Sequence, residues 1–451
     1  MNKTTGKTPA QSPPKIAIIG AGPAGCMLAR LLHLAGIPVT VFEGEASPNY
    51  RSQGGTLDLH THTGIAALKQ AGLFDKFLER ARYDGDFLQI TDKDLNVLIK
   101  RAGSPAPKES SDPEKDPSTR RRLAEQRPEI DRADLRRILT ESLPEGTIKW
   151  GYHLKQLNLG SDSRSNALVF EKNNEIETER GFDLVIGADG AWSKVRGALS
   201  DQRPEYAGVG MIEMSIPEPA TRAPELYAAV NRGNLFGQGE GKRLVVQQMG
   251  DGTLTVHIGF ATADEHWTDS CGYDATDLAQ TQAALLRQPD GLFADWHSMF
   301  HQAVLRAETK CIPRTLHKLP VGFRWEHRCG VTLVGDAAHL MTPFAGEGVN
   351  VALEDALRLA RGIIAAVEGG ADDGLDCGVF AFEEEMWTRA EKVARLTDQL
   401  TNIWMFSKGD PRSFIPKAMA LHLKFRIPGF LHPLASPFTH SYFFLKNCFQ
   451  R

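Results

Sequence analysis

The sequence predicts an α/β fold with a domain built on a parallel sheet, a second domain rich in β-strands, and a long helix near the C-terminus. Three patterns lead to this prediction. Residues 15–45 read as a strand, a helix and a second strand, which is the repeating unit of a parallel sheet. Residues 206–325 contain short segments of alternating polarity, and residues 378–406 place apolar side chains at helical spacing.

The first strand–helix–strand unit contains a glycine-rich turn. The apolar run at 16–19 leads into GAGPAG at 20–25, which fits the pattern G-x-G-x-x-G. The first glycine permits the tight turn, the second lets a pyrophosphate approach the backbone, and the third lets the helix pack closely on the strand. The second strand ends at Glu43, where a carboxylate can accept hydrogen bonds from ribose hydroxyls. The unit predicts a Rossmann-like dinucleotide site that includes Gly20, Gly22, Ala24, Gly25 and Glu43.

Two later segments also run from an apolar strand into a turn of small residues. Residues 182–196 (FDLVIGADGAWSKVR) place Asp189 in such a turn. Residues 335–350 (GDAAHLMTPFAGEGVN) precede a helix expected over 349–367. Open α/β sheets bind ligands at the carboxyl ends of their strands, and a helix N-terminus offers N–H groups to electron-rich atoms. Read alone, the first of these segments is equally compatible with a plain strand-to-helix turn.

The β-rich segment contains a hairpin around residues 250–252. Along its second strand, alternation puts four apolar residues on one face and leaves His257 and Gly259 on the other. By the same rule Glu213 lies opposite its apolar neighbours. We therefore expect His257 to face either solvent or a ligand cavity.

Other polar features leave their roles open when read alone. Arg132 and Arg136 lie one turn apart on a helix expected over 131–143, and such pairs are usually solvated. The glycine pair at 54–55 either lets the backbone approach a ligand or another strand, or is an ordinary loop. Residues 101–128 mix Pro, Ser and charges, which predicts a solvated insertion or a mobile loop.

These patterns predict a discontinuous arrangement of domains. A loose tail at 1–14 precedes the nucleotide-binding domain, which is expected over 15–205 and 326–376. The β-rich domain is expected over 206–325, and a C-terminal bridging helix and tail over 377–451. The tail beyond Asp410 is rich in Phe, Pro and His, and we leave open whether it is a lid, a dimer contact or a weak membrane contact.

Composition excludes several functional classes. The net charge of −4 and the lack of a basic stripe argue against nucleic-acid binding. Six cysteines with no C-x-x-C pair indicate separate reduced thiols, and neither a disulfide framework nor a metal site. No apolar run reaches membrane-spanning length, and the polar N-terminus lacks a signal-peptide core, so we expect a cytoplasmic protein. The oligomeric state is not predicted.

Taken together, the three turns and the β-rich segment between the last two resemble the single-component flavoprotein monooxygenases of the para-hydroxybenzoate hydroxylase type, over residues 15–405. More narrowly, GGTLDLH, the IDRADLR helix, WSKVR and DAAHLMTPFAGEGVN are similar to the tetracycline-inactivating monooxygenases of the TetX type.

The resemblance implies that FAD is the cofactor and that NADPH binds transiently as co-substrate. It assigns Arg132 and Asp58 to cofactor contacts, Asp336 to the ribityl and pyrophosphate groups, and Arg51 to NADPH, with the Asp189 region also used. The turn at the start of the 349–367 helix would lie at the flavin pyrimidine ring. The remaining implied cofactor residues are Pro343, Gly346, Glu347, Gly348, Val349 and Asn350. The implied substrate residues are Glu213, His257, Gly259 and Phe344.

The implied reaction uses NADPH and molecular oxygen to hydroxylate an electron-rich polycyclic enol or phenol, such as a tetracycline or a related aromatic polyketide. The flavin carries the bond chemistry, so no catalytic side chain is assigned. The alternatives are a reductase, halogenase or hydroxylase of another aromatic polyketide, and a flavin- or polyketide-binding protein without turnover. The absence of a W-x-W-x-I-P tract argues against a halogenase.

Two positions depart from the family pattern. Gly44 stands where the family usually has an arginine after the ribose acid, which affects the contacts on the adenine side. Glu213 stands where the tetracycline enzymes have a substrate-contacting glutamine. A carboxylate accepts hydrogen bonds without donating them, so this change alters which hydroxyls or amines the site prefers.

Overall fold

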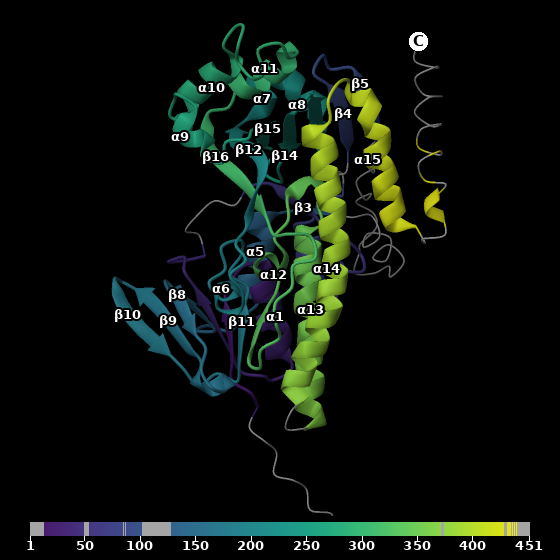
Figure 1. The fold of residues 1–451 in the computed structure, drawn as a ribbon. Coiled ribbons are helices and arrows are strands. Elements are labelled where there is room, and N and C mark those ends of the chain that lie inside the picture. The colour runs from purple at the N-terminus through teal and green to yellow at the C-terminus, as the bar shows by residue number, and fades with distance from the viewer. Residues whose placement is uncertain are drawn as a thin grey trace, which may run out of the picture.

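The computed structural model describes residues 13–48, 54–83, 85, 87–101, 128–370, 374–427, 431–433, 435, 437 and 439. Figure 1 shows a body built on a parallel sheet, a second body rich in strands, and one long helix, α14 (Gly374–Phe406), which runs beside both. Arg51 and most of the 101–128 segment lie outside the described residues.

The first body is organised around a five-stranded sheet in which every pair is parallel. Its strand order is β17-β11-β1-β2-β7. The central strand β1 is buried along its whole length, which explains its uninterrupted apolar sequence. The five strands are β1 (Ile16–Ile19), β2 (Val39–Glu43), β7 (Ile148–Trp150), β11 (Leu184–Gly187) and β17 (Val331–Leu333).

Helices pack on this sheet, and smaller sheets extend the body. The first helix, α1 (Pro23–Leu34), packs against α13 (Gly348–Gly369), which in turn packs against α14. The other helices of this body are α2 (Gly64–Gln70), α3 (Phe74–Leu78), α5 (Arg132–Glu141), α6 (Arg196–Leu199) and α12 (Asp336–His339). The smaller sheets consist of β3 (Thr56–Asp58) with β6 (Glu129–Asp131), and of β8 (His153–Asn158), β9 (Ala167–Lys172) and β10 (Glu175–Glu179).

The second body contains a seven-stranded sheet with the order β16-β12-β15-β14-β13-β4-β5. The predicted hairpin is present as an antiparallel pair of strands, β14 and β15. The strands are β4 (Leu88–Asp92), β5 (Val97–Arg101), β12 (Glu205–Ile216), β13 (Asn234–Gly239), β14 (Lys242–Gln248), β15 (Leu254–Ala261) and β16 (Thr309–Lys318).

One segment of this sheet differs from the predicted division of the chain. Residues 88–101 were expected in the nucleotide-binding domain, but β4 pairs in parallel with β13 and β5 forms the sheet edge. The two paired strands are almost 150 residues apart in the chain. The apolar pattern of a strand shows that it is a strand but not which sheet it joins, so the sequence could not predict this pairing.

The two faces of the seven-stranded sheet have different surroundings. The apolar face predicted from alternation packs into a core with Ile212, Val256 and Ile258, all fully buried. Five short helices cover this face, more than the strand-rich sequence suggested, because a continuous apolar face must be removed from water. They are α7 (Pro219–Arg222), α8 (Pro224–Val230), α9 (Trp267–Ser270), α10 (Leu278–Leu286) and α11 (Ser298–Leu305).

The long helix α14 joins the cores of the two bodies. Its first half contributes Phe382 and Met386 to the core of the parallel-sheet body. Its second half contributes Leu400 and Trp404 to a cluster shared with the seven-stranded sheet and with α15 (Pro411–Arg426). Within the described residues, no helix is both long and apolar enough to cross a membrane.

Two glycines of the first turn allow a matched test of packing. A Cβ atom at Gly25 would lie 2.1 Å from the Gly20 carbonyl oxygen, whereas a Cβ atom at Gly22 would meet no atom within 4 Å. We expect Gly25→Ala to lower the free energy of unfolding by about 1–3 kcal/mol or more, and Gly22→Ala to change it by less than about 0.5 kcal/mol. Urea unfolding of ligand-stripped protein measures both changes. Equal stability of the two variants would contradict this packing.

Candidate cofactor and substrate site

The ends of three parallel strands bring the glycine-containing turns together. A Cβ atom at Gly20, which follows β1, would lie 2.3 Å from the carbonyl oxygen of Ala188, which follows β11. The backbone N–H of Val334, after β17, donates to the Gly187 carbonyl at 2.9 Å. The three turns are therefore neighbours at the carboxyl edge of the sheet, where open α/β sheets bind ligands.

The start of α1 is open at this edge. Gly22 is the N-cap residue, and none of the side chains that the structure describes caps the helix. The first turn also contains no acidic residue, so no side chain of the helix itself neutralises the partial positive charge of its N–H groups. Together with the open space beside Gly22, this helix end suits a pyrophosphate.

Glu43 lies directly beside the glycine-rich turn. Its Oε2 accepts a hydrogen bond from the Ala21 N–H at 2.7 Å, and its Oε1 accepts one from the Glu45 N–H at 2.9 Å. Each oxygen keeps a further lone pair for a hydroxyl group. Gly44, which stands where the family usually has an arginine, lies close to His153. A Cβ atom at this position would lie only 2.7 Å from Nδ1 of His153.

Asn350 ties the start of α13 to the strand that carries Asp58. Its Oδ1 accepts hydrogen bonds from the His60 N–H at 2.8 Å and from the Thr63 hydroxyl at 3.1 Å. Its Nδ2 donates to the Asp58 carbonyl at 2.8 Å. Because the residue is fully buried and these groups are used by the protein, its side chain holds the site together.

His60, which the sequence analysis did not single out, bridges two predicted site residues. Its Nε2 lies 3.2 Å from Oδ2 of Asp58, and its Nδ1 lies 3.2 Å from Oε2 of Glu347. Burial by itself would lower the pKa of His60, but the hydrogen bonds to these two carboxylates raise it to about 9. His60 is therefore an imidazolium at neutral pH, held between Asp58 and the turn before α13.

That turn is shaped by Gly346 and begins the helix without a side-chain cap among the described residues. Gly346 has φ +70°, a conformation that glycine adopts readily. A Cβ atom there would lie 3.9 Å from Oδ1 of Asp58, whereas one at Gly348 would meet no atom within 4 Å. Pro343 is exposed and Val349 is half-buried.

Arg132 and Asp336 carry opposite charges that interact electrostatically. The surrounding protein removes water from both groups, which lowers the pKa of Arg132 and raises the pKa of Asp336, while the charge of each opposes these shifts. Both residues nevertheless keep an exposed surface. Side chains that are surrounded by protein and yet accessible line a concave surface, which is the environment expected of a cofactor site.

A buried network, also missed in the sequence, holds the Asp336 turn in place. Asp355 of α13 is fully buried and accepts from the Gly335 N–H at 2.8 Å and from the His339 ring at 2.6 Å. Arg389 of α14 donates to its other oxygen at 2.9 Å. The His339 and Arg389 charges outweigh burial and lower the pKa of Asp355. The only signal in the sequence is an acidic residue on the inner face of an amphipathic helix.

Asp189 organises its own turn. One carboxylate oxygen accepts from the Ser193 hydroxyl at 2.5 Å, and the other accepts from the N–H groups of Lys194 and Val195 at 2.7 and 3.3 Å. The carboxylate thus acts as a cap for the segment that leads into α6. Its predicted contact with a cofactor stays a prediction.

The polar face of the seven-stranded sheet lies against the paired glycines. Glu213 and His257 are direct cross-strand neighbours on β12 and β15. A Cβ atom at Gly54 would lie 2.2 Å from Oε1 of Glu213, and one at Gly55 would lie 3.9 Å from Nε2 of His257 and 3.8 Å from Nε of Arg132. The glycine pair therefore permits a close approach between the two bodies, and His257 lies at this approach.

The two polar residues of this face differ in their surroundings. Glu213 is 6% exposed, and its Oε1 has no hydrogen-bond partner in the part of the chain that the structure describes. Its Oε2 lies 3.4 Å from a terminal nitrogen of Arg314. Removal from water lowers the pKa of His257 to about 4, despite the opposing charge of Glu213, so its ring is neutral at physiological pH.

A third residue of this face, Arg243, was also missed. It is paired with the predicted substrate residue Gly259 across β14 and β15. Its guanidinium carbon lies 4.6 Å from the ring centre of Phe236, 5.6 Å from that of Phe344 and 5.4 Å from that of Trp404. Alternation along 242–248 could have placed Arg243 on the polar face, but not among these rings.

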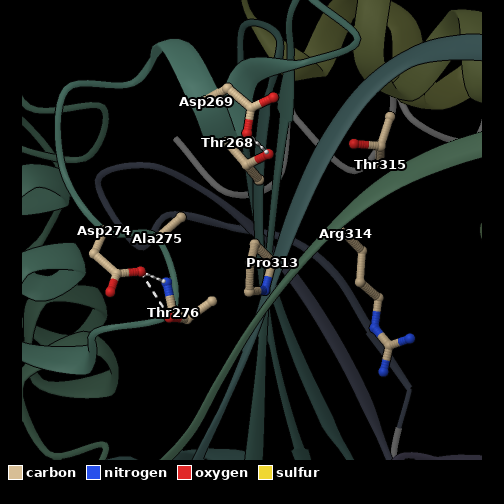
Figure 2. A pocket seen from close by; sticks show the side chains of 8 residues that line it. All are labelled: Thr268, Asp269, Asp274, Ala275, Thr276, Pro313, Arg314 and Thr315. Atoms are coloured by element: carbon tan, nitrogen blue, oxygen red, sulfur yellow. Dashed lines mark hydrogen bonds between the residues drawn. The ribbon is translucent and has the colours of Figure 1, made fainter.

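A separate cavity of about 470 Å³ lies at the outer edge of the same sheet. Figure 2 shows Asp274, Ala275 and Thr276 on one side of β16 and Arg314 on the other. Asp274 accepts hydrogen bonds from the N–H and the hydroxyl of Thr276. None of the residues that line this cavity belongs to the glycine turns. Arg314 is the link between this cavity and Glu213.

The bridge made by His60 predicts a pH-dependent stability. Because its pKa rises from 6.5 to about 9 on folding, its contribution is complete below about pH 6.5 and is lost as the pH rises through 9. We expect His60→Gln to lower the free energy of unfolding by up to about 3 kcal/mol at pH 6.5 and by much less at pH 9.5. Urea unfolding at both pH values, with exposed His153→Gln as control, measures this difference. A deficit that is independent of pH would contradict the charged bridge.

Comparison with known proteins places the chain among FAD-binding proteins. Residues 14–396 match a family model described as an FAD binding domain. Monooxygenase penA of Penicillium thymicola is 32% identical over 424 residues, which cover 85% of this chain and 93% of that protein. HpxO of Klebsiella pneumoniae, solved with FAD and uric acid, has a TM-score of 0.67 at 18% identity and covers 95% of this chain and 97% of its own.

The narrower resemblance to tetracycline-inactivating enzymes is supported only in its fold. The tetracycline destructase Tet(55) has a TM-score of 0.64 at 19% identity and covers 92% of this chain and 97% of its own. The sequence relative penA, in contrast, is a fungal monooxygenase and is more similar in sequence. From its match to the family model over most of its length and its identity with a named monooxygenase, the chain belongs to the FAD-binding-domain family and is an FAD-dependent monooxygenase.

Proposed function

We propose that this monooxygenase uses NADPH and molecular oxygen to hydroxylate an electron-rich polycyclic enol or phenol, such as a tetracycline or a related aromatic polyketide. The observation that supports the proposal is that the Gly54–Gly55 segment lies close to Glu213, to His257 and to Arg132. In this proposal, residues assigned to the substrate and a residue assigned to the cofactor lie near the same short segment.

The residues present fit FAD. The open N-terminus of α1 at Gly22 would hold the pyrophosphate, and Glu43 would accept hydrogen bonds from the ribose. Arg132 and Asp336 would contact the middle of the cofactor, and the turn from Gly346 to Val349 would offer its backbone to the flavin ring. The uncapped N-terminus of α13 would stabilise negative charge on that ring. Arg51 and the Asp189 turn remain the candidates for NADPH.

FAD, when bound, supplies the transfer of hydride from NADPH and of one oxygen atom from molecular oxygen. The chain supplies position and polarity. Glu213 would accept a hydrogen bond from a hydroxyl or amine of the substrate through its Oε1, which has no hydrogen-bond partner among the described residues. The neutral ring of His257 would exchange a hydrogen bond with a second polar group, while Phe344 and the backbone at Gly259 bound the apolar part of the substrate.

Turnover separates this proposal from its alternatives. FAD-loaded protein is incubated with NADPH and a panel of tetracyclines and anthraquinones, and the products are analysed by mass spectrometry. We expect substrate-dependent NADPH oxidation and a product heavier by one oxygen atom. A product reduced without added oxygen would indicate a reductase. A spectral shift with no use of NADPH would indicate a binding protein.

The cofactor assignment predicts a loss of FAD affinity. We expect Arg132→Ala and Asp336→Ala each to raise the dissociation constant for FAD about tenfold to a hundredfold, because each removes a charged hydrogen-bonding group. Fluorescence titration of stripped protein with FAD measures the constant. Lys155→Ala, which removes an exposed lysine on β8, serves as control. Unchanged affinity in both site variants would refute the assignment.

A further inference from the structure

Arg243 is a cation without a counter-charge in the structure described. No ion pair or side-chain hydrogen bond among the described residues involves its guanidinium, and its Nε is buried without a hydrogen-bond partner within those same residues. The only shift in its pKa comes from burial, which lowers it to about 10, so the group is still protonated at neutral pH. Arg243 is half-buried, and its Nε is fully buried. An arginine partly removed from water normally has a carboxylate or a carbonyl within reach, because an unpaired charge there is costly.

Three aromatic rings account for only part of this environment. Phe236, Phe344 and Trp404 surround the guanidinium at distances typical of cation–π contacts. Ring faces attract the positive charge but do not satisfy the in-plane N–H donors of an arginine. The rings therefore surround the guanidinium, while its Nε is left without a hydrogen-bond partner among the described residues.

The guanidinium of Arg243 comes from the same sheet face as the residues assigned to the substrate. Arg243 shares the polar sheet face with Glu213 and His257, since it pairs with Gly259, which pairs with Met211 on β12. One of its three rings is Phe344, which precedes the Gly346 turn. From strand spacing and rise, the Cα atoms of Arg243 and Glu213 are about 12 Å apart, which is the scale of a molecule with several fused rings.

We propose that Arg243 binds an anionic oxygen of the substrate, so that the enzyme selects polycyclic compounds carrying an ionised enol, phenol or carboxylic acid. This inference rests on the proposed function, because it assumes that the polar face of the sheet is the substrate site. The two ends of the site then have opposite preferences. The guanidinium of Arg243 takes the anionic end, and Oε1 of Glu213, which has no partner within the described part of the chain, takes a hydrogen-bond donor at the other end.

The test measures binding to the oxidised, FAD-loaded enzyme without NADPH, so it does not depend on turnover. The probes are 2-hydroxy-1,4-naphthoquinone, whose enol is ionised at neutral pH, and its neutral methyl ether. Anthraquinone-2-carboxylate and the corresponding carboxamide form a second pair, which distinguishes an enolate from a carboxylate as the bound group. Quenching of flavin or protein fluorescence gives each dissociation constant.

We expect Arg243→Met to weaken binding of at least one anionic probe about tenfold to a hundredfold and to leave its neutral partner within about twofold. Methionine fills the space among the three rings without a charge, so FAD content and thermal stability report whether the fold is intact. Arg243→Lys keeps the charge and should restore part of the preference for the anion. Arg395→Met, an exposed arginine on α14, is the matched control.

Two results would overturn the inference while leaving the proposed function intact. In the first, Arg243→Met weakens the charged and neutral probes equally, which would make the side chain a packing element. In the second, the unmodified enzyme binds each neutral probe as tightly as its anionic partner. Failure of turnover with every compound, combined with a preserved preference for anions, would instead refute the proposed function alone.

Discussion

The structure depends on backbone hydrogen bonding that continues past the ends of the parallel strands. The N–H of Ala188 donates to Ile19, that of Val334 donates to Gly187, and that of Gly20 donates to Phe42, at 2.8 to 2.9 Å. Each bond joins the first residues of one turn to a neighbouring strand. The turns therefore cannot move independently, and the helix ends that follow them point to the same edge of the sheet. Glycine at 20 and 25 is the condition for this approach, because any side chain would overlap a backbone carbonyl.

Further polar contacts fix the positions of the two bodies relative to each other at that edge. Asn350 connects α13 to the strand of Asp58, and His60 adds a charged bridge on the same side. On the other side of Asp58, the Thr56 N–H donates to Gln247 of the seven-stranded sheet at 3.1 Å. The segment 54–60 is thus held both by α13 and by the sheet, and α14 adds apolar contacts to both bodies. The site lies where these contacts meet.

The same edge contains charges that the protein itself does not fully satisfy. Asp355 is buried among two cations and a backbone N–H, as a structural carboxylate should be. Asp189 uses both of its oxygens within one turn. Oε1 of Glu213 and the guanidinium of Arg243, in contrast, have no such partners among the residues described, and both lie on the polar sheet face. This difference distinguishes groups that maintain the fold from groups that are available to a ligand.

What the sequence determined by itself was local. The strand, glycine turn, helix and acid of 15–45 were readable because each depends on neighbours in the chain, and the same holds for the hairpin around 250–252 and the buried faces that alternation assigned. The tertiary structure alone decided which distant residues meet. It placed β4 and β5 in the second sheet, set Gly54 against Glu213, and surrounded Arg243 with rings from three elements. The physical reason is that periodicity specifies which face of an element is apolar, whereas the partner of that face follows from packing the whole chain.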